Sequence, residues 1–373
     1  MLTKSAIIEQ SQACGFDEIG FTTAEAFESQ REVLHQRGEE YKYLIKATDL
    51  INGADPKNTI PEAKSIIVLI DLLLKESFDP KMEAHFGRYY IDEDRIAQQE
   101  LLQRTRDFVQ FLRDDGMQAK VSHNIPHRAA ASRAGMGSVG KNCIMYSAKP
   151  GSENSWLILT VIVVDRALES DVSRDEDMYD CPDWCRNTCI VSCPTQALKG
   201  PRKLDPRRCI SNLTYNAREI TPLELREPLG MWIYGCDRCQ NVCPRNDAWF
   251  VKKKAVNKRV AAKTPDFELT KLLHMDEEYF VSKVWPHMFY IPPKNLWLWK
   301  MNVARAMGNT LDRKYVPELV RAFQENSDDR VQGMIAWSLG RLGGEAARDA
   351  LDGFLSTSEG SVMAEVQQAL EMF

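Results

Sequence analysis

Two cysteine-rich stretches decide the fold of this chain: CPDWCRNTCIVSCP, residues 181–194, and GCDRCQNVCP, residues 235–244. The first holds four cysteines and ends in Cys193-Pro194; the second holds three and ends in Cys243-Pro244. Cys209 lies between them and brings the number of thiols to eight. Two 4Fe-4S clusters need eight thiolate ligands, and a Cys-Pro pair closing each run is typical of bacterial two-cluster ferredoxins. The sequence therefore predicts an electron-transfer module.

The ferredoxin pattern also predicts which thiols belong together, because the cysteine before each proline ligates the cluster of the other run. One predicted ligand set is Cys181, Cys185, Cys189 and Cys243. The other is Cys193, Cys209, Cys236 and Cys239. The first run departs from the bacterial pattern, because three residues separate its cysteines where that pattern has two.

Other uses of these cysteines fit less well. Zinc sites usually pair two C-x2-C knuckles, and only Cys236 and Cys239 have that spacing here. Disulfide scaffolds are typically small and secreted, whereas this chain has 373 residues, 44% of them hydrophobic. No three cysteines show the C-x3-C-x2-C spacing of a radical-SAM site.

Length and composition favour two or three domains and a cytoplasmic protein. The most apolar runs, 65–74 and 156–164, are as long as strands and too short to span a membrane, so no membrane partner is expected. The net charge is −5, but residues 199–263 carry 15 Lys and Arg against 6 Asp and Glu. This basic segment either balances anionic clusters nearby or contacts RNA phosphates.

Three domains are predicted. Residues 1–178 form an α/β domain, with a helix over 2–15, strands at 18–21, 65–70 and 156–164, and a long helix over 92–116. Residues 179–262 form the double-cluster domain. Residues 263–373 form helical repeats, because Asn302–Gly308 recurs as Met334–Gly340 and a degenerate copy lies at 366–370. This pattern is typical of HEAT-type repeats, and it assigns Ala304, Met307, Ala336 and Leu339 to the core.

A glycine-rich loop precedes the cysteines, AGMGSVGKN at 134–142. It contains G-x-G-x-x-G, but a helical Ala/Arg stretch precedes it where a dinucleotide site needs a strand. Its glycines allow a bulky ligand to approach the backbone closely.

This loop, Cys193-Pro194-Thr195, RRCISNLT at 207–214 and GCDRCQNVCP at 235–244 together resemble the epoxyqueuosine reductases. The resemblance extends to PEAKSIIV at 61–68 and to Ala336–Gly340, and so covers most of the chain. It implies a nitroreductase-like α/β domain that binds base-off cobalamin beside two 4Fe-4S clusters, as in the related reductive dehalogenases. It also implies a reductase, with tRNA as a possible partner and reduced ferredoxin or flavodoxin as electron donor. The cobalamin-binding residues it suggests are those of the loop: Gly135, Gly137, Gly140, Lys141 and Asn142. No D-x-H-x-x-G motif supplies a histidine ligand for cobalt.

The chain departs from this family where the family carries its catalytic acid. An ungapped alignment places Val121 at the position of the family's aspartate, and residues 121–128 contain no carboxylate. His127 replaces the glutamate that normally precedes the arginine, and the Tyr-His pair of the family is absent after Tyr90. Candidate proton donors are therefore His123, His127 and Tyr89, with Tyr90 comparable. The remaining thiols, Cys14 and Cys143, are predicted to be small packing residues.

Two functions are consistent with these features. The first is a cobalamin-dependent iron–sulfur reductase whose substrate is left open by the missing acid, with a dehalogenase-like reaction as a variant. The second is an electron-transfer or corrinoid-carrying partner, for example of a methyltransferase, which has no substrate of its own and does not act on tRNA.

Overall fold

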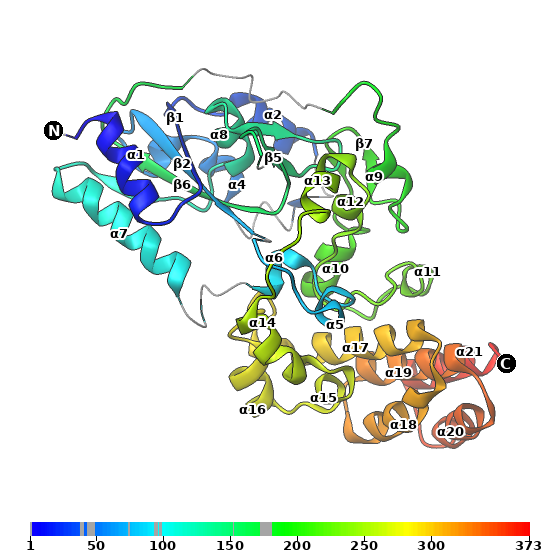
Figure 1. Cartoon of the computed structure of the whole chain (residues 1–373). Coiled ribbons are helices and arrows are strands. Elements are labelled where there is room, and N and C mark those ends of the chain that lie inside the picture. The colour runs from blue at the N-terminus through cyan, green and yellow to red at the C-terminus, as the bar shows by residue number, and fades with distance from the viewer. Residues whose placement is uncertain are drawn as a thin grey trace.

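The computed structural model describes residues 2–37, 41–42, 49–73, 75–92, 96, 99–151, 153–171 and 181–373. Three parts are visible in Figure 1: an α/β part at the top, a cysteine-rich part beside it, and a helical array at the bottom. The expected fold class is confirmed. Within the described residues, no helix is long and apolar enough to cross a bilayer.

An antiparallel sheet of four strands, in the order β1-β2-β6-β3, forms the centre of the first part. Its strands are β1 (Glu18–Thr23), β2 (Ser65–Leu72), β6 (Leu157–Val164) and β3 (Ala119–Val121). Strands β2 and β6 are the two continuous apolar runs, and they pair with each other at the centre. Side chains alternate along β2, so Val68 enters one hydrophobic cluster and its neighbour Leu69 enters another on the opposite face. Both faces of the sheet are buried, as the unbroken apolar pattern predicts.

Helices cover the two faces. Helices α1 (Lys4–Ala13) and α7 (Glu100–Asp114) pack on one face, and α8 (His127–Arg133) packs on the other. Helix α7 is shorter than expected, because Asp92 ends the preceding helix and Gln99 caps α7 with a left-handed φ of 57°. The helix was expected to begin at residue 92, and most of the residues between Asp92 and Gln99 lie outside the described part of the chain. The other elements of this part are α2 (Glu28–Gln36), α4 (Leu50–Gly53), η2 (Pro56–Asn58), α5 (Pro80–Glu83), α6 (Arg88–Ile91), β4 (Gly137–Val139) and β5 (Met145–Ser147).

The cysteine-rich part is built from short elements. Helices α9 (Thr188–Val191) and α12 (Arg238–Asn241) contact each other, and each leads into a Cys-Pro pair. The rest of this part consists of β7 (Leu198–Gly200), β8 (Lys203–Leu204), α10 (Ile210–Asn216), α11 (Leu223–Arg226), η3 (Pro244–Asn246) and α13 (Asp247–Phe250).

The helical array repeats one packing contact. Its inner helices α17 (Leu296–Thr310), α19 (Asp329–Leu342) and α21 (Gly360–Leu370) lie side by side, with α18 (Val316–Glu325) and α20 (Glu345–Leu355) outside them. A Cβ on Gly308 would lie 2.9 Å from Ser338 of α19, and one on Gly340 would lie 2.7 Å from the Ala369 carbonyl of α21. The recurring glycine thus lets each inner helix approach the next. The four residues assigned to the core are fully buried.

Shorter elements lead into this array. They are α14 (Lys258–Lys263), η4 (Thr264–Phe267), α15 (Leu269–His274), α16 (Glu277–Tyr279), η5 (Phe280–Val284), η6 (Pro293–Asn295) and, within the array, η7 (Arg313–Tyr315).

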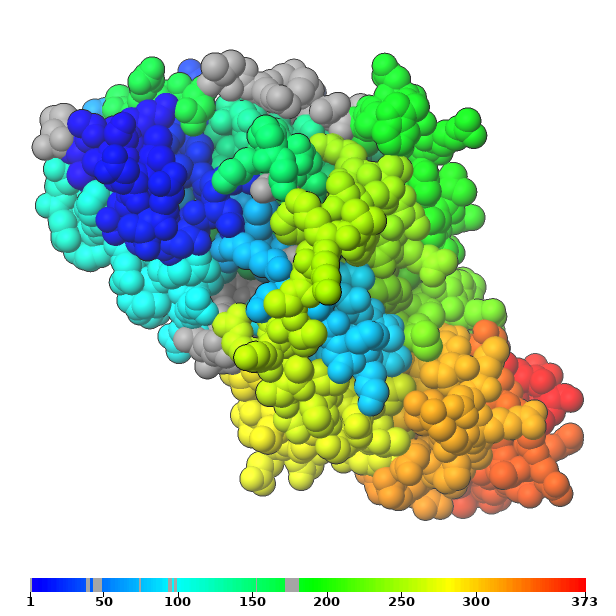
Figure 2. All heavy atoms as spheres, in the orientation of Figure 1, coloured from blue at the N-terminus to red at the C-terminus, as the bar shows by residue number. Residues whose placement is uncertain are grey.

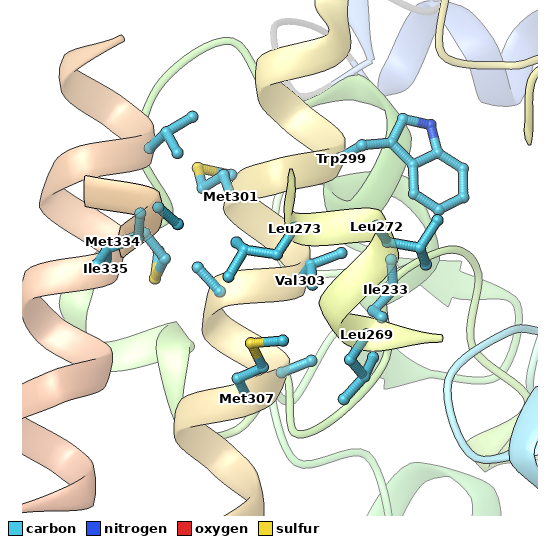
Figure 3. Close-up of a cluster of buried hydrophobic side chains, with 14 of the residues drawn as sticks. Ile233, Leu269, Leu272, Leu273, Trp299, Met301, Val303, Met307, Met334 and Ile335 are labelled. Carbon is cyan, nitrogen blue, oxygen red and sulfur yellow. The ribbon is translucent and has the colours of Figure 1, made fainter. Parts of the chain in front are cut away.

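A single hydrophobic cluster joins the three parts. Figure 3 shows Ile233 of the cysteine-rich part lying near Leu269, Leu272 and Trp299 of the helical part. Phe86 belongs to the same cluster, although it precedes α6 in the first part. In Figure 2 the light-blue chain that contains it lies between the yellow-green and orange parts of the molecule. The boundaries 1–178, 179–262 and 263–373 stay predictions, and this core crosses all of them.

The glycine contact between α17 and α19 gives a first prediction. Gly308→Ala should destabilise the protein by about 1–3 kcal/mol, because the new methyl overpacks against the Cβ and backbone of Ser338. The apparent melting temperature, measured anaerobically, should fall by roughly 2–4 °C per kcal/mol. Gly353→Ala is the matched control: it lies in α20 with no atom within 4 Å of the new Cβ, so it should raise the melting temperature slightly. Equal effects of the two substitutions would contradict this account.

Candidate functional site

The eight thiols interact electrostatically with one another, and the strongest of these interactions divide them into two groups. Cys189 interacts electrostatically with Cys243, Cys181 and Cys185. We name these four cysteines the outer group. Cys236 interacts in the same way with Cys209 and Cys193, and Cys239 interacts with Cys236 and Cys209; these four are the inner group. Cys239 also interacts electrostatically with Cys189 of the outer group, so the two groups are neighbours. Iron ligation by these thiols stays a prediction.

Burial and mutual repulsion disfavour the thiolate forms of Cys189, Cys236 and Cys239. Burial raises the pKa of Cys189 to about 11, and the neighbouring sulfurs add to the shift. Burial also raises the pKa of Cys236 and of Cys239. Within the described residues, no three His, Cys, Asp or Glu side chains converge on one point as the ligands of a mononuclear site do. Backbone N–H groups reach two sulfurs, from Lys141 to Cys181 and from Ala197 to Cys193, both at 3.3 Å. Such hydrogen bonds tune the potential of a cluster.

A cavity of about 430 Å³ lies against the inner group. All four inner thiols line it, and no outer thiol does. The other side is formed by the sheet and by the loop after β4, with an apolar surface made by Ile144, Met145, Trp156, Leu157 and Leu159. The inner group therefore borders a space large enough for a ligand, whereas the outer group does not.

The glycine-rich loop contributes Asn142 to this cavity. Its side-chain amide donates to the Tyr146 hydroxyl at 2.9 Å and to the Cys239 carbonyl at 3.3 Å, which ties the loop to the inner group. Gly137 and Gly140 have a packing role instead, because a Cβ on Gly137 would lie 2.0 Å from the Tyr146 carbonyl and one on Gly140 would lie 2.9 Å from the Tyr146 ring. Gly135 has a left-handed φ of 72°, and Lys141 bonds Cys181 through its backbone.

The candidate acids lie in different places. His127 and Tyr89 line the cavity, as does Tyr90, whereas His123 is exposed and does not line it. The Nε2 of His127 lies 2.8 Å from the Ser122 carbonyl, and burial lowers the pKa of this imidazole. Neutral His127 therefore donates Nε2–H to that carbonyl and offers only an acceptor at Nδ1. Tyr89 keeps a phenol that can donate a proton.

Sequence reasoning missed Asp237, a buried carboxylate that lines the cavity. Burial raises its pKa to about 6, against the opposing effect of Arg88. The Arg88 backbone N–H donates to it at 2.8 Å and the guanidinium at 3.2 Å. Its position between Cys236 and Cys239 was visible in the sequence, but the contact with Arg88 joins residues 149 apart and has no local signal.

The two remaining thiols differ in their surroundings. Cys14 packs against the hydrophobic cluster that contains Ile7 and Phe16, which fits the expected packing role. Cys14 and Cys143 are each only partly buried. Cys14 caps α1 far from the site, whereas Cys143 lines the cavity with a left-handed φ of 65°.

The basic segment is partly used in internal contacts. Lys252 donates to the Gly151 carbonyl at 2.8 Å, and Lys252 and Lys254 lie over the ring of Trp249. Arg259 pairs with Asp92 at 2.9 Å. Both interpretations of this segment, charge balance and RNA contact, stay predictions.

Similarity to known proteins agrees with this architecture. Residues 181–246 match the family "4Fe-4S double cluster binding domain", and residues 297–371 match HEAT repeats. An epoxyqueuosine reductase of Lactococcus garvieae is 30% identical over 361 residues, which cover 91% of this chain and 96% of that protein. The chain belongs to the epoxyqueuosine reductase family. It is therefore an iron–sulfur oxidoreductase.

Further relatives cover nearly the whole chain. The epoxyqueuosine reductase of Bacillus subtilis is 28% identical over 393 residues, 99% of this chain and 95% of that protein. A solved structure of the B. subtilis family member, described as having its catalytic aspartate loop swung out of the active site, superposes with a TM-score of 0.80 at 25% identity and covers 99% of this chain and 98% of that one. A second solved structure, of an epoxyqueuosine reductase with an epoxyqueuosine-modified tRNA stem loop, gives a TM-score of 0.79 at 25% identity and the same coverage.

The grouping of the thiols predicts that one cluster can be lost while the other keeps its iron. Cys236→Ser should remove the inner cluster and leave about half of the roughly eight iron atoms per chain that two 4Fe-4S clusters hold. Cys14→Ser is the control, because this thiol belongs to neither group, and it should keep the full iron content. Iron analysis and electron paramagnetic resonance of anaerobically purified protein make the comparison. Full iron in Cys236→Ser would remove this residue from the ligand set.

Assembly of the clusters should depend on pH in a defined direction. Thiols must lose their protons to bind iron, and burial raises the pKa of Cys189 to about 11, so protons compete with iron at neutral pH. Reconstitution of the iron-free protein should therefore be faster at pH 8.5 than at pH 7, measured by the growth of visible absorbance. A rate that is independent of pH would contradict the proton competition.

Proposed function

We propose that this protein reduces epoxyqueuosine in tRNA, using electrons that pass through two 4Fe-4S clusters to a base-off corrinoid in the cavity. The observation that carries the proposal is the cavity itself, because it is lined at once by all four inner thiols and by a broad apolar surface. Family members share the fold over nearly the whole chain, and one of them is solved with an epoxyqueuosine-modified tRNA stem loop.

The residues present fit a corrinoid. The apolar surface suits the face of a large flat macrocycle, and Asn142 and Ser211 add polar groups to the lining of the cavity. His127 is the one histidine among the described residues that line the cavity. Its Nε2 is already hydrogen-bonded to the Ser122 carbonyl. A corrinoid bound here would supply a cobalt centre of low potential for the reduction.

The chain's own residues prepare the two sides of this chemistry. The outer thiols would hold a cluster away from the cavity, and the inner thiols would hold one against it, an arrangement that supports inward electron flow. Trp184 and Val191 of the first cysteine run are 64% and 80% exposed, and this favours docking of a reduced ferredoxin or flavodoxin beside the outer group. Tyr89 lines the cavity and can hold the proton that the product needs.

The decisive experiment supplies the anaerobically purified, iron-loaded protein with cobalamin, a chemical reductant and tRNA that carries epoxyqueuosine. Queuosine should form, detected by mass spectrometry of the released nucleosides. Protein that is loaded and reduced but makes no queuosine would overturn the tRNA reaction. Reduction of a haloaromatic compound, or of a methyltransferase corrinoid, would then identify the alternative.

The same assay tests the proton donor. Tyr89→Phe should lower turnover by about 100-fold or more, the usual range for removing a general acid, with tRNA binding unchanged. Tyr90→Phe is the matched control, because burial raises the pKa of the Tyr90 phenol well above its usual value and its hydroxyl lies 3.4 Å from Ser211. A Tyr89→Phe protein with full turnover would exclude this phenol as the donor.

A further inference from the structure

The second cysteine run contains a buried carboxylate to which the proposed reaction gives no role. Asp237 stands between Cys236 and Cys239, two thiols of the inner group, and it is 2% exposed. Both thiols interact electrostatically with Asp237. Asp237 also lines the cavity. The carboxylate therefore lies where the inner group meets the space for a ligand.

The hydrogen bonds around this carboxylate fit its ionised form. One oxygen accepts the backbone N–H of Arg88 at 2.8 Å and the guanidinium of the same residue at 3.2 Å. The other oxygen faces the side-chain amide of Gln240 at 3.5 Å. All three groups are donors, whereas a protonated carboxyl would need an acceptor for its own hydrogen. The geometry thus holds a negative charge at Asp237.

Arg88 offsets this negative charge only in part. Its guanidinium also donates to the two carboxylate oxygens of Glu83, at 2.8 and 3.2 Å, and to the Asn241 side chain at 2.6 Å. One positive charge is therefore shared between two carboxylates. The Arg88 side chain is 11% exposed, and charges so poorly solvated act on their neighbours more strongly than surface charges do.

A fixed charge beside a 4Fe-4S cluster changes its reduction potential. Each electron that enters a cluster adds negative charge, so a nearby carboxylate disfavours the reduced form and a nearby guanidinium favours it. A cluster of lower potential gives up its electron more readily. Asp237 lies next to two inner thiols, and its charge should therefore act mainly on the inner cluster.

We propose that Asp237 acts on the reaction through the inner cluster: its negative charge lowers the reduction potential of that cluster and strengthens it as the electron donor of the cavity. The inference rests on the proposed function, because it needs a 4Fe-4S cluster on the inner thiols. In the step that it favours, the reduced inner cluster loses one electron and the ligand in the cavity gains it.

The test removes one charge at a time and measures the potentials of both clusters. Asp237→Asn removes the negative charge and keeps the shape of the side chain. Arg88→Gln removes the positive charge and keeps the backbone N–H that donates to Asp237. Asp183→Asn is the matched control, because this residue lies between two cysteines of the first run but is exposed. Redox titrations of the anaerobic, iron-loaded protein at pH 8 are followed by electron paramagnetic resonance, and Cys236→Ser identifies the inner signal by its loss.

Asp237→Asn should favour the reduced inner cluster by roughly tenfold, which raises its potential by about 59 mV for one electron. Arg88→Gln should shift the same potential downward. Asp183→Asn should leave both potentials at the wild-type values, because solvent and salt screen an exposed charge. If one variant loses the inner cluster, the sign of the shift in the other decides. An unchanged inner potential in Asp237→Asn, or shifts of one sign in both charge variants, overturns the proposal, because packing defects alone do not follow the sign of the removed charge.

The measurement needs neither tRNA nor a corrinoid, so it separates this inference from the proposed function. Shifts of opposite sign in a protein that makes no queuosine support the role of Asp237. An unchanged potential in Asp237→Asn, when the wild type does make queuosine, overturns that role and leaves the proposed function standing. A wild type with one redox-active cluster instead of two would overturn both.

Discussion

The loop that carries Cys236 is the constraint on which the rest of the structure depends. Asn302 of the helical array donates to the Thr214 carbonyl at 2.7 Å and to the Ile233 carbonyl at 3.1 Å. The Thr214 hydroxyl accepts the N–H of Gly235 at 2.9 Å, directly before the cysteine. From the other side, Gly87 donates to the Tyr234 carbonyl at 2.9 Å. Buried hydrogen bonds of this kind fix one geometry, because breaking any of them leaves a polar group without a partner.

The fully buried Arg305 belongs to the same junction. Its guanidinium donates to the Trp232 carbonyl and to Asn302, and burial lowers its pKa to about 9. The helical array thus supports the inner group through polar contacts as well as through the hydrophobic cluster around Trp299. Electron transfer and helical packing share one interface.

Sequence patterns identified the parts of this molecule whose signals are local. The cysteine spacings, the apolar strands β2 and β6 and the recurrence of Gly308 as Gly340 each lie within a short segment, and each predicted its element. The start of α7 was placed too early because Asp92 and Gln99 carry cap conformations that composition does not reveal. The periodicity of a helical segment predicts which face of the helix is buried more reliably than it predicts where the helix begins and ends.

The site itself was predictable only in part. The Cys-Pro rule predicts a grouping of the thiols that joins residues far apart in sequence, and the assignment of each thiol to a cluster stays a prediction. The cavity did not follow from such a rule, because Tyr89, Asn142, Ser211 and Asp237 come from four separate segments. The role of Gly137 was also hidden, since its close neighbour Tyr146 becomes visible only when β4 pairs with β5. Such contacts depend on tertiary packing, which no spacing rule encodes.

The hydrophobic cluster shared by the three parts limits how the chain can be divided into separate folding units. A repeat array that only touched its neighbour could be lost or exchanged without harm to the rest. Here removal of α17 would expose Phe86 and Ile233 to water and release the loop before Cys236. The array is therefore part of one folding unit with the cysteine-rich part, and the two cannot be separated without exposing a common core.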